Sequence, residues 1–279
     1  MKNTGHFWPL VIAFATLVTG CKEIPIVIPN TSTSSRKVLV EEVTGVRCQN
    51  CPDGTRELVA LQNNLGADNL VVVSIHQAGG TYSLPFTMEP PTNLYDFRFP
   101  DAKTLANFLG APDGYPAATI NRHLTEGNTS LFSSRSAWSS LITDEFAKDY
   151  GLSMFLNNKY DPATRQLIIS LNLAPEQTLA GENRLTILIT QDSIVDVQQD
   201  GGSRNPNYIH RHVLRQVVSA PTGDVINEPL TGNALVKKTY TVTLPDNFKA
   251  GHCSVVAFVH HGGNPDKEVL QVMEAHVTE

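Results

Sequence analysis

Two cysteines separated by two residues, Cys48 and Cys51, stand between a strand-like and a helix-like segment. Residues 38–43 (VLVEEV) have the composition of a strand. Within residues 58–65, leucines recur at the spacing of an amphipathic helix. Residues 69–75 (NLVVVSI) are almost continuously apolar, which is typical of a parallel strand buried on both faces. We therefore predict a βαβ unit with the cysteine pair at its first strand-to-helix turn.

The position of the pair determines what its sulfurs can do. A thiol at the N-terminus of a helix faces unpaired amide donors and the positive end of the helix dipole, which favours the thiolate. Two intervening residues bring the second sulfur within disulfide reach of the first. We therefore predict a redox centre in which Cys48 is the attacking thiol and Cys51 resolves the mixed disulfide.

A Cys-x-x-Cys motif in a βαβ unit resembles the active site of thioredoxin-like proteins. In that family a cis-proline before a central strand faces the cysteines, and residues 114–122 (GYPAATINR) have the matching form and order. The resemblance implies site roles for Tyr115 and Pro116, with Pro116 holding the substrate backbone beside the sulfurs. It also implies a proton relay by a buried acid six residues before the first cysteine, where Glu42 stands.

The loop departs from the usual thioredoxin pattern in two ways. Arg47 stands where the family has tryptophan, and Gln49 and Asn50 replace Gly-Pro between the cysteines. Asp53 in the first helical turn opposes the thiolate, whereas Arg47 supports it. The reduction potential and the direction of exchange therefore do not follow from these residues.

Two other interpretations of the pair remain open. A zinc site normally needs four ligands, and the chain has no second Cys-x-x-Cys; the nearby His76 does not complete a set. A static disulfide on a scaffold that no longer performs exchange is the stronger alternative. It predicts the same bond as the redox centre and differs in whether the bond turns over.

The N-terminus predicts an export signal. Lys2 precedes an apolar run that is too short to span a bilayer, and the run ends at LVTGC. This pattern resembles the lipobox of bacterial lipoproteins, which implies a signal peptide over residues 1–20 and acyl chains on Cys21. An ordinary secretory signal is the alternative. Residues 21–36 lack a helical period and are predicted to be a tether. Lys22 rather than an aspartate follows Cys21, and this resemblance to outer-membrane lipoproteins implies a location at the outer membrane, either periplasmic or surface-exposed.

The charge pattern excludes one class of partner. The formal net charge is −6, and the basic residues do not gather in a stripe that could neutralise a phosphate backbone. We therefore predict no nucleic-acid partner. No cofactor is predicted either.

The second half of the chain changes character. After a helix-like stretch at residues 135–150, short β-type runs alternate with Pro, Gly, Asn and Asp. We predict an α/β thioredoxin-like domain over residues 37–150. We predict that an all-β antiparallel sandwich, Ig-like or jelly-roll-like, follows it over residues 151–279.

One further cysteine and six histidines stand in the predicted sandwich, and four of these histidines form two close pairs. Cys253 begins a strand-like run, which predicts a small buried apolar residue rather than a nucleophile. His210 and His212 are predicted to share one strand face, and His260 and His261 are adjacent. No sequence argument joins the two histidine pairs, so no metal site is predicted.

The lipoprotein start, EEVTGVRCQNCP, GYPAATINR and the C-terminal segments YIHRHVLRQV and EVLQVMEAHV together resemble the Omp28-related outer membrane proteins of Bacteroidetes. The resemblance implies an envelope lipoprotein with a thioredoxin-like half and a β-sandwich half. Two functions follow as hypotheses: thiol–disulfide exchange on exported proteins, or a non-enzymatic surface module that binds a protein or a glycan. In the second, Cys48–Cys51 is a structural disulfide.

Overall fold

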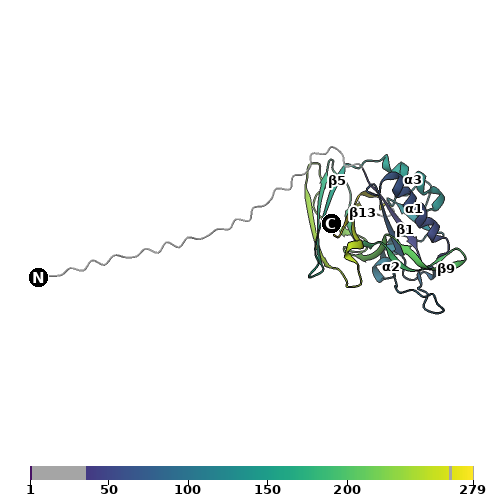
Figure 1. Cartoon of the computed structure of the whole chain (residues 1–279). Helices are drawn as coiled ribbons and strands as arrows, with labels where there is room; N and C mark the ends of the chain where they lie inside the picture. Colours follow the sequence, from purple (N-terminus) through teal and green to yellow (C-terminus); the bar gives the residue numbers. More distant parts are fainter. Residues whose placement is uncertain (2–35, 264–265, 279) are drawn as a thin grey trace. The chain divides into compact units, whose positions relative to one another are not determined.

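The computed structural model describes Met1, residues 36–263 and residues 266–278 (Figure 1). Strands dominate the described part of the chain, where fourteen strands accompany three α-helices. Within these ranges no helix combines the length and the apolar character needed to cross a membrane.

The predicted N-terminal features fall mostly elsewhere. The signal peptide (1–20), the lipidation site Cys21 and the tether (21–36) lie outside the described residues, except for Met1 and Arg36.

The main sheet contains nine strands from both halves of the chain. In sheet order they are β14 (Val269–His276), β13 (Cys253–His261), β7 (Asn183–Gln191), β10 (Val213–Val217), β2 (Leu70–His76), β1 (Val38–Thr44), β3 (Ala117–Ile120) and β4 (Phe132–Ser134), with β11 (Asp224–Val225) paired to β7. β1 and β2 are parallel, as predicted, and every residue of both strands is buried.

The two halves of the sheet meet between β2 and β10. These strands run parallel, with Val213 opposite Ser74, and the Ser74 amide donates to the His212 carbonyl at 2.8 Å. The antiparallel pairing of β10 with β7 then continues the sheet to β13 and β14.

Helices cover both faces of the β1–β2–β3 region (Figure 1). α1 (Cys51–Leu65) and α3 (Trp138–Phe146) pack on one face, where Leu58, Trp138 and Ile142 contact the apolar side chains of β1 and β2. α2 (Pro100–Leu109) packs on the opposite face through its buried leucines and alanines. The leucine spacing that predicted a helix is confirmed, since Leu58 is buried and the other leucines of the stripe pack beside it.

Two smaller sheets complete the strands. The first, ordered β12 (Val236–Thr243), β6 (Gln166–Pro175) and β5 (Leu152–Asp161), packs on β7, β13 and β14 around a second apolar core. The second is a hairpin of β8 (Ile194–Asp200) and β9 (Ser203–His210). Three short 3₁₀ helices are η1 (Thr81–Ser83), η2 (Arg135–Ala137) and η3 (Ala250–His252).

The predicted fold class is wrong. No separate α/β thioredoxin-like domain precedes an all-β antiparallel sandwich, because one mixed sheet takes strands from both sides of residue 150. The physical reason is the edge of β2, whose backbone groups are satisfied by β10 from the second half. The sequence pattern of residues 69–75 shows that the strand is buried but not which strand pairs with it. The boundary at residues 150 and 151 stays a prediction.

Candidate functional site

The cysteine pair forms a disulfide at the start of α1. The Cys48–Cys51 bond joins Cα atoms 5.4 Å apart, and the Cys48 amide donates to the Gly45 carbonyl at 3.0 Å, which closes the turn before the helix. Both residues are buried, with Cys48 2% exposed and Cys51 1% exposed. The predicted bond is therefore present, and very little of either cysteine is accessible to solvent.

The β8–β9 hairpin covers this loop. The Gly201 amide donates to the Gln49 carbonyl at 2.9 Å, and the Gln199 amide donates to the Val46 carbonyl at 2.7 Å. The buried Gln198 side chain donates from Nε2 to the Gly45 and Cys48 carbonyls, both at 3.1 Å. Four hydrogen bonds therefore tie a hairpin 150 residues away in the chain to the cysteine loop. The sequence patterns did not predict this cover.

Arg47 contacts a neighbouring loop. Its Nε donates to the Leu84 carbonyl and one terminal nitrogen donates to the Pro85 carbonyl, both at 2.7 Å. The guanidinium also lies 4.8 Å from the centre of the Phe86 ring. These contacts hold the loop around η1 beside the cysteine loop.

Tyr115 and Pro116 lie near the disulfide. The bond between them is cis, and the Tyr115 hydroxyl donates to Gln77 Oε1 at 2.7 Å. Tyr115 and Cys48 line one open hollow of about 320 Å³. A Cβ built on Gly54 of α1 would lie 3.0 Å from the Pro116 Cβ, so glycine lets α1 approach the proline closely. The catalytic roles predicted for both residues stay predictions.

Glu42 is buried beneath the start of α1. Its Oε2 accepts a hydrogen bond from the Ser74 hydroxyl at 3.3 Å, while Oε1 has no partner among the described residues and lies 2.8 Å from a Cβ built on Gly54. Burial raises the pKa of Glu42 to about 8, and the Ser74 hydrogen bond partly opposes this shift. Glu42 is therefore protonated at neutral pH, and its proton-relay role stays a prediction.

Glu41 points to the other face of β1. It forms a buried ion pair with Arg122, with two nitrogen–oxygen distances of 2.7 Å, and it also accepts from the Thr119 hydroxyl at 3.0 Å. The Arg122 guanidinium lies 4.7 Å from the centre of the Phe258 ring. The two adjacent acids therefore differ: Glu41 is paired with a cation, whereas Glu42 has one hydrogen bond from a neutral hydroxyl.

The histidine arrangement differs from the prediction. His210 ends β9, whereas His212 lies in the following turn at a φ of 51°, so the two do not share a strand face. His210 instead approaches His76 at the end of β2, with ring centres 6.0 Å apart. His260 is buried and bonds to the Thr186 hydroxyl, while His261 is only partly buried.

Cys253 is a buried free cysteine, as predicted. It belongs to the core under the three-stranded sheet, and burial raises the pKa of its thiol to about 11. The thiol is therefore protonated at neutral pH and is not an activated nucleophile.

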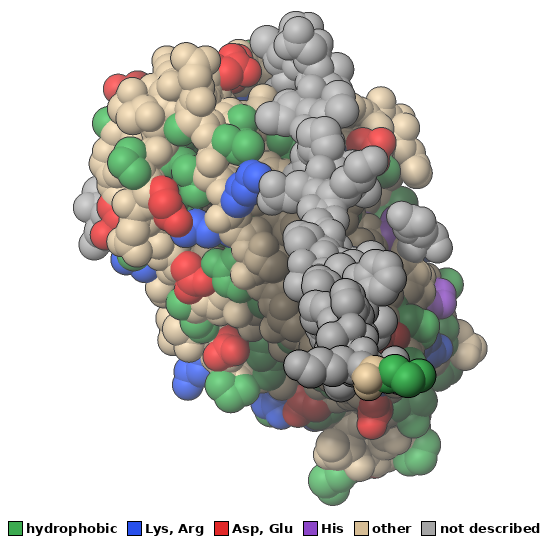
Figure 2. Space-filling view, turned by 90° about the vertical axis from the view of Figure 1, so that its left-hand side faces the viewer, with side chains coloured by type: hydrophobic (Ala, Val, Ile, Leu, Met, Phe, Trp, Pro, Cys, Tyr) green, Lys and Arg blue, Asp and Glu red, His purple; other side chains and the backbone are tan. Residues whose placement is uncertain are grey.

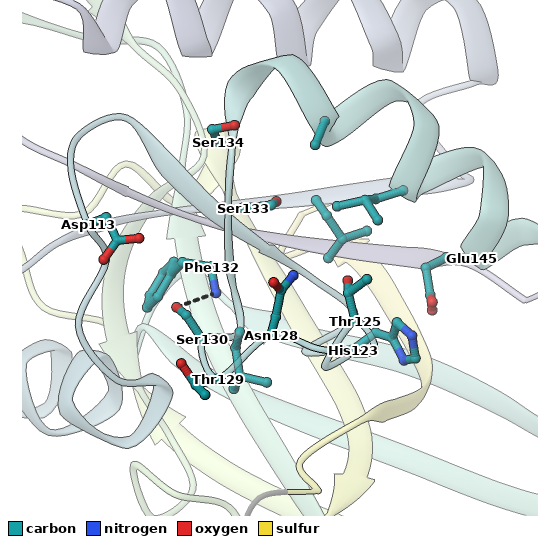
Figure 3. A pocket seen from close by; sticks show the side chains of 14 residues that line it. Asp113, His123, Thr125, Asn128, Thr129, Ser130, Phe132, Ser133, Ser134 and Glu145 are labelled. Carbon is teal, nitrogen blue, oxygen red and sulfur yellow. Dashed lines mark hydrogen bonds between the residues drawn. The ribbon is translucent and has the colours of Figure 1, made fainter.

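A pocket of about 450 Å³ opens between β3, β4 and α3 (Figure 3). Hydroxyl, amide and carboxyl side chains project along its wall, and the apolar Ile120, Leu131 and Leu141 form part of the lining. The side chains of Thr125, Asn128 and Thr129 make no hydrogen bond to other described residues. Sequence reasoning missed this pocket because its residues come from a loop without a recognisable motif.

One end of the pocket carries a charged cluster of His123, Glu145 and Glu268, whose candidate ligand atoms lie within 4.8 Å of one another. Two cations already contact its acids. Arg36 lies 2.7 Å from Glu145, and Lys148 lies 2.6 Å from Glu145 and 3.3 Å from Glu268. This cluster is therefore an internally neutralised network rather than a vacant acidic site for a cation.

One face of the molecule shows how the charged side chains are distributed. On the face drawn in Figure 2, acidic and basic side chains are interspersed among polar and apolar ones.

Two solved structures resemble this chain to different degrees. HBP35 of Porphyromonas gingivalis is similar with a TM-score of 0.68 at 15% sequence identity, over 89% of this chain and 77% of that chain, a likeness that shows the fold alone. A crystal structure of a domain of the outer membrane lipoprotein Omp28 from Porphyromonas gingivalis matches 46% of this chain and 88% of that chain, with 20% identity and a TM-score of 0.33. No curated protein matches the chain significantly.

A family model described as outer membrane protein Omp28 matches residues 103–279, which is more than half of the chain. The predicted family and the predicted outer-membrane location are thereby confirmed. The chain belongs to the Omp28 family of outer membrane proteins.

Proposed function

We propose that this protein is a non-enzymatic binding module of the outer membrane, anchored by acyl chains on Cys21, in which Cys48–Cys51 is a structural disulfide. The observation that carries the proposal is the burial of both cysteines, at 2% and 1% exposure, under the β8–β9 hairpin. Exchange requires a substrate thiolate to reach one of the two sulfurs along the S–S axis. The hairpin occupies part of the space from which such a substrate would approach.

The contribution of a structural disulfide in this position is modest. A cross-link between residues three apart in sequence restricts a very short loop in the unfolded chain. The chain-entropy relation gives about 2 kcal/mol for a loop of this size. The bond then holds the Cys48 carbonyl where Gln198 binds it, so that the loop and the hairpin support each other.

We place ligand binding in the pocket between β3, β4 and α3, and we propose a glycan as the ligand. A volume of about 450 Å³ lies in the range of small-ligand sites. The unpaired hydroxyl and amide groups of Thr125, Asn128 and Thr129 match the hydrogen-bonding pattern of sugar hydroxyls. The apolar side chains on the same wall suit the carbon face of a sugar ring.

A redox experiment tests the structural role of the disulfide. Insulin reduction with dithiothreitol as the terminal reductant, and isomerisation of a scrambled disulfide substrate in a glutathione redox buffer, are measured for the protein and for its Cys48→Ser variant. We expect no turnover above the level of Cys48→Ser, because the disulfide is covered. Turnover that disappears in Cys48→Ser would support the second candidate, thiol–disulfide exchange.

That second candidate rests on two specific observations. Cys48 shares an open hollow with Tyr115, and the protonated Glu42 is buried close to the first turn of α1. Exchange at this site would require the hairpin to move from the cysteine loop. The rate of disulfide reduction by a small thiol, compared between the intact and unfolded protein, measures how often this happens.

A binding experiment tests the pocket. A panel of soluble oligosaccharides is titrated into the protein and followed by saturation-transfer NMR. We expect Asn128→Ala and Thr129→Ala to weaken a bound sugar about tenfold together, since each removes a hydrogen-bonding group. Asn64→Ala, an exposed change on α1, is the matched control and leaves binding unchanged. Sugar binding that is unaffected by the pocket variants would place the ligand elsewhere.

A further inference from the structure

A second, much smaller cavity lies behind the disulfide. It has a volume of about 10 Å³ and is lined by the ends of β2 and β9, the first turn of α1 and the start of β10. Its lining includes Cys51, Ser74, His76, Tyr208 and His210. The space accommodates one particle the size of a water molecule or a metal ion.

His76 enters this cavity without a partner for its ring nitrogens. The residue ends β2 and is 2% exposed. Neither Nδ1 nor Nε2 has a hydrogen-bond partner among the described residues. A neutral imidazole carries one donor and one acceptor, and leaving both unsatisfied in the interior destabilises the fold.

His210 presents one free nitrogen to the same cavity. Its Nε2 has no partner among the described residues. A neutral ring that is protonated on Nδ1 keeps the lone pair of Nε2 for a ligand.

Aromatic packing alone does not explain why two histidines with unpartnered ring nitrogens, His76 and His210, lie side by side here. Phe97 lies 4.8 Å from the centre of the His76 ring and 5.0 Å from that of His210, so the three rings form a buried cluster. This packing covers the faces of the imidazoles. Three nitrogen atoms at the ring edges, two on His76 and one on His210, still lack partners.

We propose that His76 and His210 together bind a single transition-metal ion of the kind that prefers imidazole ligands, such as Zn²⁺ or a copper ion. A metal bonds an imidazole nitrogen at about 2.0–2.1 Å, so an ion shared by two rings leaves their centres roughly 5–6 Å apart. The observed separation is 6.0 Å. Hydroxyl groups of Ser74 and Tyr208 on the same wall, or a water molecule, complete the coordination.

The chemistry of the lining selects the class of ion. No carboxylate lines the cavity, which disfavours Mg²⁺ and Ca²⁺ because they require oxygen ligands with negative charge. Imidazole nitrogens are ligands that Zn²⁺ and copper ions prefer, and the lining offers two imidazoles. Arg211 also lines the cavity and opposes a cation there, but this residue is exposed to solvent, which screens its charge.

Metal titration of the full chain tests the proposal. The protein is treated with a chelator, dialysed, and titrated separately with Zn²⁺ and Cu²⁺, with stoichiometry measured by elemental analysis and affinity by calorimetry. We expect one ion per chain and a rise in melting temperature on binding. His76→Phe and His210→Phe keep an aromatic ring in the cluster and each weaken binding at least a hundredfold. His252→Gln, an exposed histidine, is the matched control and leaves binding unchanged.

Two results would overturn the proposal. One is the absence of stoichiometric binding by either ion, and the other is binding that persists in both phenylalanine variants. Should these variants fail to fold, anomalous diffraction at the metal edge from crystals of the unsubstituted protein decides the matter. A peak between the two rings supports the site, and a peak elsewhere or none refutes it.

Discussion

Two neighbouring glutamates on β1 show that the surroundings of a side chain determine whether its carboxyl group carries a charge. Successive side chains of a strand point to opposite faces, so Glu41 meets Arg122 and Glu42 enters the apolar space under α1. Both carboxylate oxygens of Glu41 accept hydrogen bonds from the Arg122 guanidinium. Glu42 has one hydrogen bond from Ser74, and the loss of hydration therefore dominates its pKa.

Glu42 makes stability fall as pH rises. Its pKa is about 8 in the fold and roughly 4.3 in the unfolded chain. The folded protein therefore holds a proton that the unfolded chain releases, and this stabilisation is present below about pH 4 and lost as pH rises to about 8. The Glu42→Gln variant has no ionisable group at this position, so it does not lose this stability as pH rises. We expect the variant to be roughly 2–5 kcal/mol more stable than the unsubstituted protein at pH 9, with a small difference at pH 4.

Urea denaturation at pH 4 and pH 9 measures this effect. Glu126→Gln, at an exposed position, is the control and follows the unsubstituted protein at both pH values. An equal stability change for Glu42→Gln at the two pH values would contradict the raised pKa.

At the scale of elements, the β8–β9 hairpin determines the accessibility of the disulfide. It belongs to the second half of the chain, yet its amides and the Gln198 side chain bond to carbonyls of the cysteine loop. The same hairpin supplies Tyr208 and His210 to the cavity behind Cys51. A single element therefore covers the sulfurs on one side and builds the proposed metal site on the other.

Replacement of Gln198 by leucine tests this cover. The change leaves the buried carbonyls of Gly45 and Cys48 without their side-chain donor, at a cost of about 1–3 kcal/mol. We expect the disulfide to be reduced by dithiothreitol at least tenfold faster than in the unsubstituted protein, as followed by maleimide labelling. Gln177→Leu, which loses an exposed bond to the Tyr150 carbonyl and does not line the hollow at Cys48, serves as the control. An unchanged reduction rate would show that the hairpin does not limit access.

At the scale of the whole molecule, one sheet connects two apolar cores. The core between β1–β2 and the helices α1 and α3 is separated in sequence from the core under the three-stranded sheet. Both cores nevertheless pack on strands of the same nine-stranded sheet, which is continuous through β2 and β10. We therefore expect the described chain to unfold as one cooperative unit.

A substitution in one core tests cooperativity in the other. Ile169→Ala in β6 creates a cavity in a fully buried position and costs about 2–5 kcal/mol. With Trp8 replaced by phenylalanine, Trp138 in α3 reports the distant core by fluorescence. We expect its urea midpoint to fall together with that of circular dichroism. If the urea midpoint measured by Trp138 fluorescence stays unchanged, the two cores unfold as independent domains. Thr241→Ala, on the exposed face of β12, is the control.

Local patterns predicted local structure well. The leucines of residues 58–65 predicted α1, the apolar run at 69–75 predicted β2, and the spacing of Cys48 and Cys51 predicted their disulfide. Each of these depends on neighbours a few residues apart. His210 shows where such reasoning fails: its neighbour in space is His76, 134 positions earlier in the chain, and the sequence paired it with His212 instead.

The sequence by itself determined the family, the outer-membrane location, the strands and helices around the cysteine pair, and the bond between the two sulfurs. The tertiary structure alone decided that β10 completes the edge of β2, that a distant hairpin buries the disulfide, and that two histidines face one cavity. The physical reason is that helix periods, strand alternation and turns arise from interactions between near neighbours in the chain. Strand pairing and burial depend on which backbone edges and apolar faces remain free when the whole chain packs.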